Sequence, residues 1–202
     1  MSKLAKFALV SIALIVLAGC RAGSEEDSQA AQLELLSVQD KATRSQESQL
    51  NQDNLSSEGA CSLSILDEQL LAAVNEARSE ARWCGATHYQ ATTPVTWNCD
   101  VEPAAHAHSR DMADNNFFSH TGSDGLRVSH RVDRTDYEWS MLGENIAAGY
   151  TSTNAVMTGW LASPGHCATI MSDDYLEMSA AMVIAEQADY YTYWTLIMAR
   201  GW

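Results

Sequence analysis

The sequence predicts an α+β domain in which a small antiparallel sheet lies between layers of helices. The last stretch, EMSAAMVIAEQADYYTYWTLIMA, holds two β-rich runs that are parted by Gln187, Ala188 and Asp189. Both faces of each run are apolar, and strands of that kind are covered on both sides. Three segments upstream carry the apolar stripes or caps of helices. We therefore expect an antiparallel hairpin with helices packed on each of its faces.

The predicted helices begin and end at recognisable signals. A helix over 64–82 has a serine at its cap and one apolar stripe, and a helix over 100–115 has an aspartate at its cap. A third helix fits residues 154–163, and we expect Pro164 and the glycine after it to end that helix. Residues 143–149 are a candidate third strand.

Two histidines of the second predicted helix lie on opposite sides of it. His108 shares the apolar stripe with Ala104 and Met112, whereas His106 falls on the polar side. A histidine on an apolar stripe is more often a core residue than a ligand. We interpret His108 as a core histidine that is hydrogen-bonded to the backbone, and His106 as solvated.

The first 19 residues have the pattern of a secretory signal peptide. Two lysines precede an apolar run over 7–18, and that run of 12 residues is shorter than the roughly 20 that a spanning helix needs. The segment LAGC that ends at Cys20 resembles the bacterial lipobox, which implies a lipid on Cys20 and a membrane anchor. An ordinary cleaved signal and a permanent span are the alternatives. Arg21 stands where an aspartate would favour the inner membrane, so we expect the outer membrane in a Gram-negative host.

The composition divides the rest of the chain at residue 60. Residues 20–60 are polar, with scattered leucines and without aromatic residues or proline, which is typical of a disordered tether. A transient helix within the tether is the alternative. All tryptophans and tyrosines lie after residue 60. We therefore expect one domain over 61–202, a size that can bury a core.

The predicted domain is strongly acidic. Residues 61–202 hold 7 arginines, no lysine and 18 acidic residues, which is a formal charge of −11. Such a surface repels phosphate backbones, so nucleic acid is not an expected partner. We expect a monomer.

Four cysteines remain in the predicted domain: Cys61, Cys84, Cys99 and Cys167. An even set in an exported chain favours disulfides over metal ligation, and their spacings include no C-x-x-C. Four cysteines allow three pairings, and the sequence by itself does not choose among them.

Five segments resemble, in order, the bacterial branch of the CAP superfamily, also called the SCP-like family of secreted domains. The segments are LAAVNEARSEARWCG, HSRDMADNNFFSHTGSDG, GENIAAG, WLASPGHCATIM and YYTYWTLIMA, and they cover about residues 65 to 202. The resemblance implies an α-β-α sandwich, which agrees with the hairpin apolar on both faces. Members of the superfamily are associated with sterol and lipid binding, with divalent cation binding and with proteolysis.

The resemblance also implies a cleft. The first histidine of the family's cleft falls on His120, the first glutamate on Glu144 and the second histidine on His166. The position of the second carboxylate is Ser163 here, which weakens a mechanism that needs four groups. Structural roles in loops and turns are the alternative for each of these residues.

The resemblance further implies that Cys84 pairs with Cys167 and that Cys61 pairs with Cys99. Gly165 would then allow a turn after the third helix, and the bond at Cys167 would hold the neighbouring histidine in the cleft.

Two imidazoles and a carboxylate with one open position suit Zn²⁺ or another divalent cation. Without a metal, one ring is a candidate general base and Ser163 a candidate nucleophile or water anchor. The sequence therefore predicts an envelope-anchored CAP-domain lipoprotein whose cleft of His120, Glu144 and His166 binds a divalent cation, a lipid or sterol, or another envelope ligand. A metal-assisted hydrolase or peptidase and a structural module of the cell envelope are the alternatives.

Overall fold

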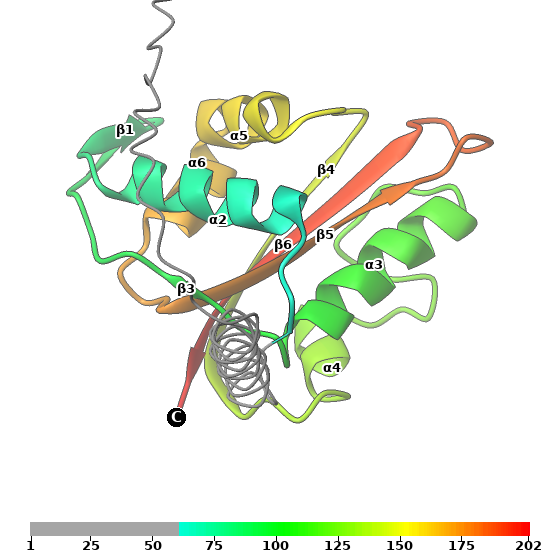
Figure 1. The fold of residues 1–202 in the computed structure, drawn as a ribbon. Coiled ribbons are helices and arrows are strands. Elements are labelled where there is room, and N and C mark those ends of the chain that lie inside the picture. The colour runs from blue at the N-terminus through cyan, green and yellow to red at the C-terminus, as the bar shows by residue number, and fades with distance from the viewer. Residues whose placement is uncertain (1–60) are drawn as a thin grey trace, which may run out of the picture. The chain divides into compact units, whose positions relative to one another are not determined.

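A four-stranded sheet forms the middle layer of residues 61–202, the part of the chain that this computed structural model describes (Figure 1). Its strand order is β3-β5-β6-β4. The strands are β3 (Thr96–Trp97), β4 (Trp139–Ala148), β5 (Glu177–Ile184) and β6 (Thr192–Gly201). β6 pairs antiparallel with both β5 and β4, whereas β3 pairs parallel with β5. The expected hairpin and third strand are confirmed, and the sheet is mixed because of β3.

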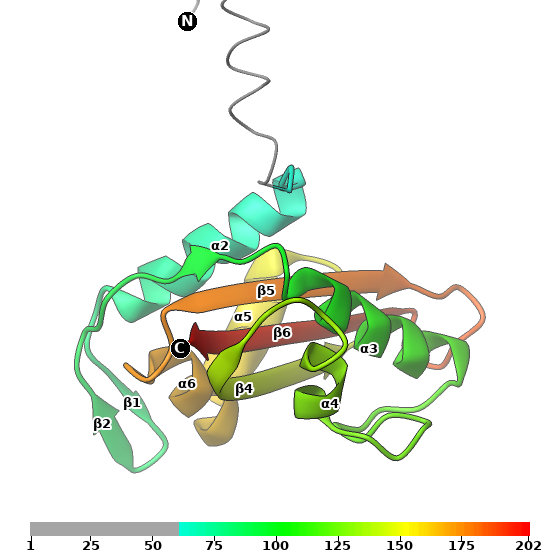
Figure 2. The same cartoon turned by 90° about the horizontal axis from the view of Figure 1, so that it is seen from below.

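Helices cover both faces of this sheet, with α2, α5 and α6 on one face and α3 and α4 on the other (Figures 1 and 2). They are α2 (Ile65–Arg78), α3 (Glu102–Asp114), α4 (Val128–Val132), α5 (Thr153–Ala162) and α6 (Pro164–Met171). A separate antiparallel hairpin consists of β1 (Arg82–Cys84) and β2 (Thr87–Tyr89). The α+β class and the sandwich are thus confirmed. No helix within 61–202 has both the length and the apolar character to cross a membrane. The predicted signal peptide, the lipid on Cys20 and the tether lie outside the described residues.

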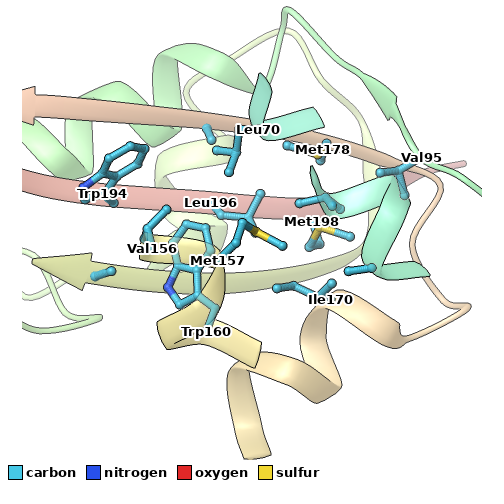
Figure 3. Packing of buried hydrophobic residues seen from close by; sticks show 14 residues of the cluster. Leu70, Val95, Val156, Met157, Trp160, Ile170, Met178, Trp194, Leu196 and Met198 are labelled. Carbon is cyan, nitrogen blue, oxygen red and sulfur yellow. The ribbon is translucent and has the colours of Figure 1, made fainter. Parts of the chain in front are cut away.

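Strand β6 explains why both faces of the C-terminal runs are apolar. Trp194, Leu196 and Met198 are buried in the core beneath α2, α5 and α6 (Figure 3). Their neighbours along the strand point to the opposite face, where Ile197 and Ala199 pack in the cluster beneath α3 and α4. Because β6 is buried on both faces, its sequence does not alternate between apolar and polar residues as that of a half-exposed strand does.

Two helices begin or end at other residues than the sequence predicts. The helix that starts after Ser64 ends at Arg78, because the chain turns there into the β1–β2 hairpin. The next helix begins at Glu102, and its expected cap, Asp100, does not cap it. Instead the side-chain oxygen of Asn98 accepts hydrogen bonds from the backbone N–H groups that precede the helix, at 2.9 and 3.2 Å.

The third predicted helix is confirmed as α5, which ends before Pro164, but Pro164 starts a further helix where a turn was expected. α5 ends at Ala162, Ser163 forms the junction, and α6 begins directly at Pro164. Proline is well tolerated in the first turn of a helix, where its missing N–H would have no partner in any case. His166 therefore lies in the first turn of α6, and the expected turn at Gly165 is absent.

Both disulfides join the segments that the family resemblance implies. Cys84 of β1 is bonded to Cys167 of α6, and Cys61 is bonded to Cys99. Gly85 follows β1 with a φ of 64°, and a Cβ there would lie 2.9 Å from the Pro164 side chain. The β1–β2 hairpin is therefore packed tightly against the start of α6, next to the bond.

Arg78 is a fully buried cation that holds the far end of α6. Its Nη1 donates hydrogen bonds of 2.7 Å to the carbonyl oxygens of Ile170 and Ser172. Its Nε and Nη2 donate to the carbonyls of Thr93 and Tyr175, at 2.8 and 3.1 Å. A positive charge at the C-terminus of a helix is favourable, because unpaired carbonyls carry partial negative charge there.

We predict that Arg78→Met lowers the free energy of unfolding by about 3 kcal/mol or more, because four carbonyls lose their donor. Urea denaturation of the full chain measures this. The control is Arg110→Met on the exposed side of α3. Equal losses in the two variants would show that the buried hydrogen bonds do not stabilise the domain.

Candidate functional site

The predicted His120 and Glu144 meet at the outer edge of β4, which is an edge strand of the sheet. Glu144 lies within β4, and its side chain is only 4% exposed. His120 comes from the loop between α3 and α4, and its side chain is 45% exposed. The distance from His120 Nδ1 to Glu144 Oε1 is 2.7 Å. A half-exposed imidazole is thus hydrogen-bonded to a buried carboxylate.

Arg131 binds the other oxygen of the same carboxylate. Its Nη2 donates to Glu144 Oε2 at 2.6 Å, and the Arg131 side chain is only 6% exposed. The guanidinium also donates to the carbonyl oxygens of Leu126 and His120, at 3.1 and 3.3 Å. Arg131 therefore ties the loop that carries the imidazole to the strand that carries the carboxylate.

The loop is also anchored to α3. Both carboxylate oxygens of Asp111 accept hydrogen bonds from Ser123, one from its backbone N–H at 2.8 Å and one from its hydroxyl at 2.5 Å. The N–H of Gly122 donates to the carbonyl of Leu126 across the loop at 2.9 Å. The loop thus has its own internal structure, which fixes where His120 can lie.

Glu144 is ionised at neutral pH despite its burial. Burial raises the pKa of this carboxyl, but the hydrogen bond from His120 and the charge of Arg131 outweigh that effect and lower the pKa overall. An ionised carboxylate only accepts hydrogen bonds, so the Nδ1 of His120 carries the proton of their shared bond. In the neutral imidazole, Nε2 then remains free to accept a proton or to bind a ligand.

A second histidine lies behind the carboxylate. His108 of α3 is fully buried, as predicted, with its Nε2 3.9 Å from Glu144 Oε1. Within residues 61–202 neither ring nitrogen has a hydrogen bond of ordinary geometry, although the backbone of Ser119 lies near enough to the ring to raise its pKa. Burial lowers the pKa of His108, and the charge of Glu144 offsets this only in part. His106 is exposed, as expected.

His166 approaches the pair from the opposite helical layer. Its backbone carbonyl accepts a 3.0 Å hydrogen bond from the side chain of Asn145 on β4, and its neighbour Cys167 is fixed by the disulfide. Burial lowers the pKa of His166, and the nearby charge of His120 lowers it further. The structure therefore brings the second imidazole close to the first, without a direct bond between them.

Two hollows open beside these rings. A hollow of about 350 Å³ is lined by His166 and Ser163 together with apolar residues of the loop, β4, α5 and the β5–β6 connection. A hollow of about 250 Å³ is lined by His120, Arg127, Val128 and Glu144. The histidine rings that form hydrogen bonds within 61–202 bond to residues other than Ser163, so Ser163 has no imidazole partner there.

The cluster does not offer three direct ligands to a metal ion. No three histidine, cysteine, aspartate or glutamate side chains of residues 61–202 are grouped so that they could hold one. Both oxygens of Glu144 already accept hydrogen bonds, one from His120 and the other from Arg131. Glu144 fits as a carboxylate that orients an imidazole, an arrangement typical of metal-bound histidines.

Residues 71–198 match the model of the family described as CAP, the cysteine-rich secretory protein family. The chain belongs to this family. Sequence reasoning placed His120, Glu144 and His166 in the CAP cleft but missed Arg131 and assigned His108 only to the core. Nothing in the sequence around Arg131 marks it, because its partner is a strand residue that only the fold brings near.

Two relatives from Bacillus subtilis (strain 168) are similar to part of the chain. The uncharacterized membrane protein YlbC is 31% identical over 98 residues, 48% of this chain and 27% of that protein. The uncharacterized protein YkwD is 26% identical over 94 residues, 46% of this chain and 37% of that protein. The similarity thus spans only about a quarter and a little over a third of these relatives.

Two solved structures share the fold. An outer surface protein from Borrelia burgdorferi superposes with a TM-score of 0.56 at 17% identity, covering 67% of this chain and 92% of that one. An extracellular protein containing a SCP domain from Bacillus anthracis str. Ames has a TM-score of 0.54 at 23% identity, covering 70% and 45%. At these identities the likeness concerns the fold alone.

We predict that His108 makes the domain less stable as the pH falls below its ordinary pKa of 6.5. Its pKa in the folded state lies below the ordinary value of 6.5, so the unfolded chain binds the proton first. The contribution of neutral His108 to stability is fully present above pH 6.5, and it is lost as the pH falls toward the lowered pKa of the folded state. His108→Leu should flatten the pH dependence of the unfolding free energy in urea titrations.

His106→Leu is the matched control on the same helix, and it should keep the slope of the parent. Because the pKa of His166 is also lowered, His108→Leu should remove only part of the slope. If the unfolding free energy of His108→Leu depends on pH as steeply as that of the parent, His108 is not a source of the pH dependence.

Proposed function

We propose that this CAP-domain protein is exported and anchored to the cell envelope, where its cleft of His120, Glu144 and His166 binds a ligand. The observation that carries the proposal is the Glu144 carboxylate, held ionised by a buried arginine beneath a half-exposed imidazole. Burying an ion pair costs desolvation energy and often adds little to stability. Its use here is to hold an imidazole in one orientation at the surface, which suits a binding site.

The sequence and the relatives support a place in the envelope. The predicted signal peptide ends in a lipobox at Cys20, and the domain holds two disulfides, which form in oxidising compartments. The partial relative YlbC is called a membrane protein, and the structurally similar Borrelia protein is called an outer surface protein. We propose a lipid anchor at Cys20, with the outer membrane as its site in a Gram-negative host.

The hollows beside the imidazoles suit a ligand with both apolar and polar parts. The larger hollow is lined mostly by apolar and aromatic side chains together with His166, while His120 lines the smaller hollow. Pockets of this kind fix a ligand's orientation through few polar contacts. A lipid, a sterol or another envelope component remains the proposed class.

A divalent cation such as Zn²⁺ is the second candidate ligand. The free Nε2 of His120 and the ring of His166 are two nitrogen donors, and Glu144 would orient the first ring from behind. A bound ion would supply a Lewis acid, which is the basis of the alternative hydrolase or peptidase activity. Catalytic zinc sites have three protein ligands, and this site offers two. We therefore favour an organic ligand over a cation.

We predict that a cleft ligand binds at least tenfold more weakly to His120→Ala and to His166→Ala than to the parent. Loss of one hydrogen bond to a charged or polarised group corresponds to about that factor. Calorimetric titration of the full chain with Zn²⁺, with palmitate and with the peptide Ala-Ala-Phe measures the affinities.

His106→Ala, which removes an exposed imidazole from α3, is the control and should bind as the parent does. The proposal is abandoned if none of the three probes separates the two cleft variants from this control.

A further inference from the structure

The two hollows lie next to each other along the edge of β4. Glu144 borders the smaller hollow and Ile146 borders the larger one. The same order holds on the facing loop, where His120 borders the smaller hollow and Phe118 the larger. Residues two apart on a strand are about 7 Å apart and point to the same side. A ligand of modest size can therefore reach into both hollows at once.

The larger hollow is uncharged and walled by aromatic rings. Phe118 and Tyr190 are 45% and 48% exposed, and their ring centroids are 5.9 Å apart. Trp160 and Ile146 form its buried floor, and neither carboxylates nor guanidinium groups line it. Half-exposed aromatic rings around such a space favour a large apolar side chain.

The smaller hollow has the opposite character, since it is locally cationic. Arg131 neutralises Glu144, so that carboxylate does not repel an anion there. Arg127 lines the hollow and is exposed, and no acidic residue in the described part of the chain forms a salt bridge with it. A guanidinium that has no salt-bridge partner is a site for a carboxylate, on a domain whose formal charge is −11.

We propose that the cleft binds the C-terminal residue of a peptide, with its carboxylate at Arg127 and its apolar side chain in the larger hollow. This inference rests on the proposed function and names the ligand class of that site. With bond lengths of about 1.5 Å, the carboxylate and the ring of a terminal phenylalanine are on the order of 5 to 7 Å apart. That separation matches the spacing of the two hollows along β4. Charge complementarity selects the free C-terminus over an internal peptide segment.

The test compares Ala-Ala-Phe with its C-terminal amide in titrations of the full chain. We expect the free acid to bind at least tenfold more tightly than the amide, since the amide lacks the charge. Arg127→Gln should remove this preference, so that the acid and the amide bind with the same affinity. Tyr190→Ala should weaken both peptides about tenfold, because the apolar wall is shortened.

Tyr191→Asn is the matched control for the aromatic wall. Tyr191 is the next residue, 47% exposed, does not line the hollow and has a φ of 63°, which asparagine tolerates. Its removal should leave both affinities unchanged. Thermal unfolding of each variant separates loss of binding from loss of folding.

The outcomes separate this inference from the proposed function. Equal affinity for the acid and the amide contradicts the proposal that the cleft binds a peptide C-terminus. A preference for the acid that persists in Arg127→Gln contradicts it as well. Tighter binding of palmitate than of the peptide acid, lost in His120→Ala, also overturns it while the ligand-binding cleft stands. If Zn²⁺, palmitate and the peptide each bind His120→Ala as tightly as the parent, both this inference and the proposed function are overturned.

Discussion

The ion pair between Arg131 and Glu144 is the interaction on which the site depends. A carboxylate that is 4% exposed stays charged only because a guanidinium and an imidazole share its two oxygens. Without the arginine, burial would favour the neutral acid, and His120 would lose the acceptor that fixes its orientation. The pair also joins α4, the loop before it and β4, so it positions the site.

The second imidazole depends on separate supports in the other helical layer. His166 lies in the first turn of α6, and this helix is held at its start by the Cys84–Cys167 bond and at its end by Arg78. The Asn145 side chain, which points to this layer from the residue next to Glu144, bonds the carbonyl of His166. Adjacent residues of one edge strand thus bond the His120 ring on one face and the backbone of His166 on the other, which brings both histidines to the strand's edge.

The sequence predicted the layers well, because two-sided apolar strands and capped helices are local patterns. Pro164 was misread because proline and glycine together resemble a turn, although proline also suits the first turn of a helix. Motif resemblance located His120, Glu144 and His166. Arg131 and the contact of His108 with Glu144 were missed, since burial and pairing between distant segments are properties of the fold.

The protonation of the His120 ring tests this account most directly. Nitrogen-15 NMR of the imidazoles in the full chain at neutral pH distinguishes a proton on Nδ1 from one on Nε2. The account predicts that neutral His120 carries its proton on Nδ1, and that Glu144→Ala and Arg131→Gln both reduce this preference. A proton on Nε2 in the parent, unchanged in the two variants, would contradict it.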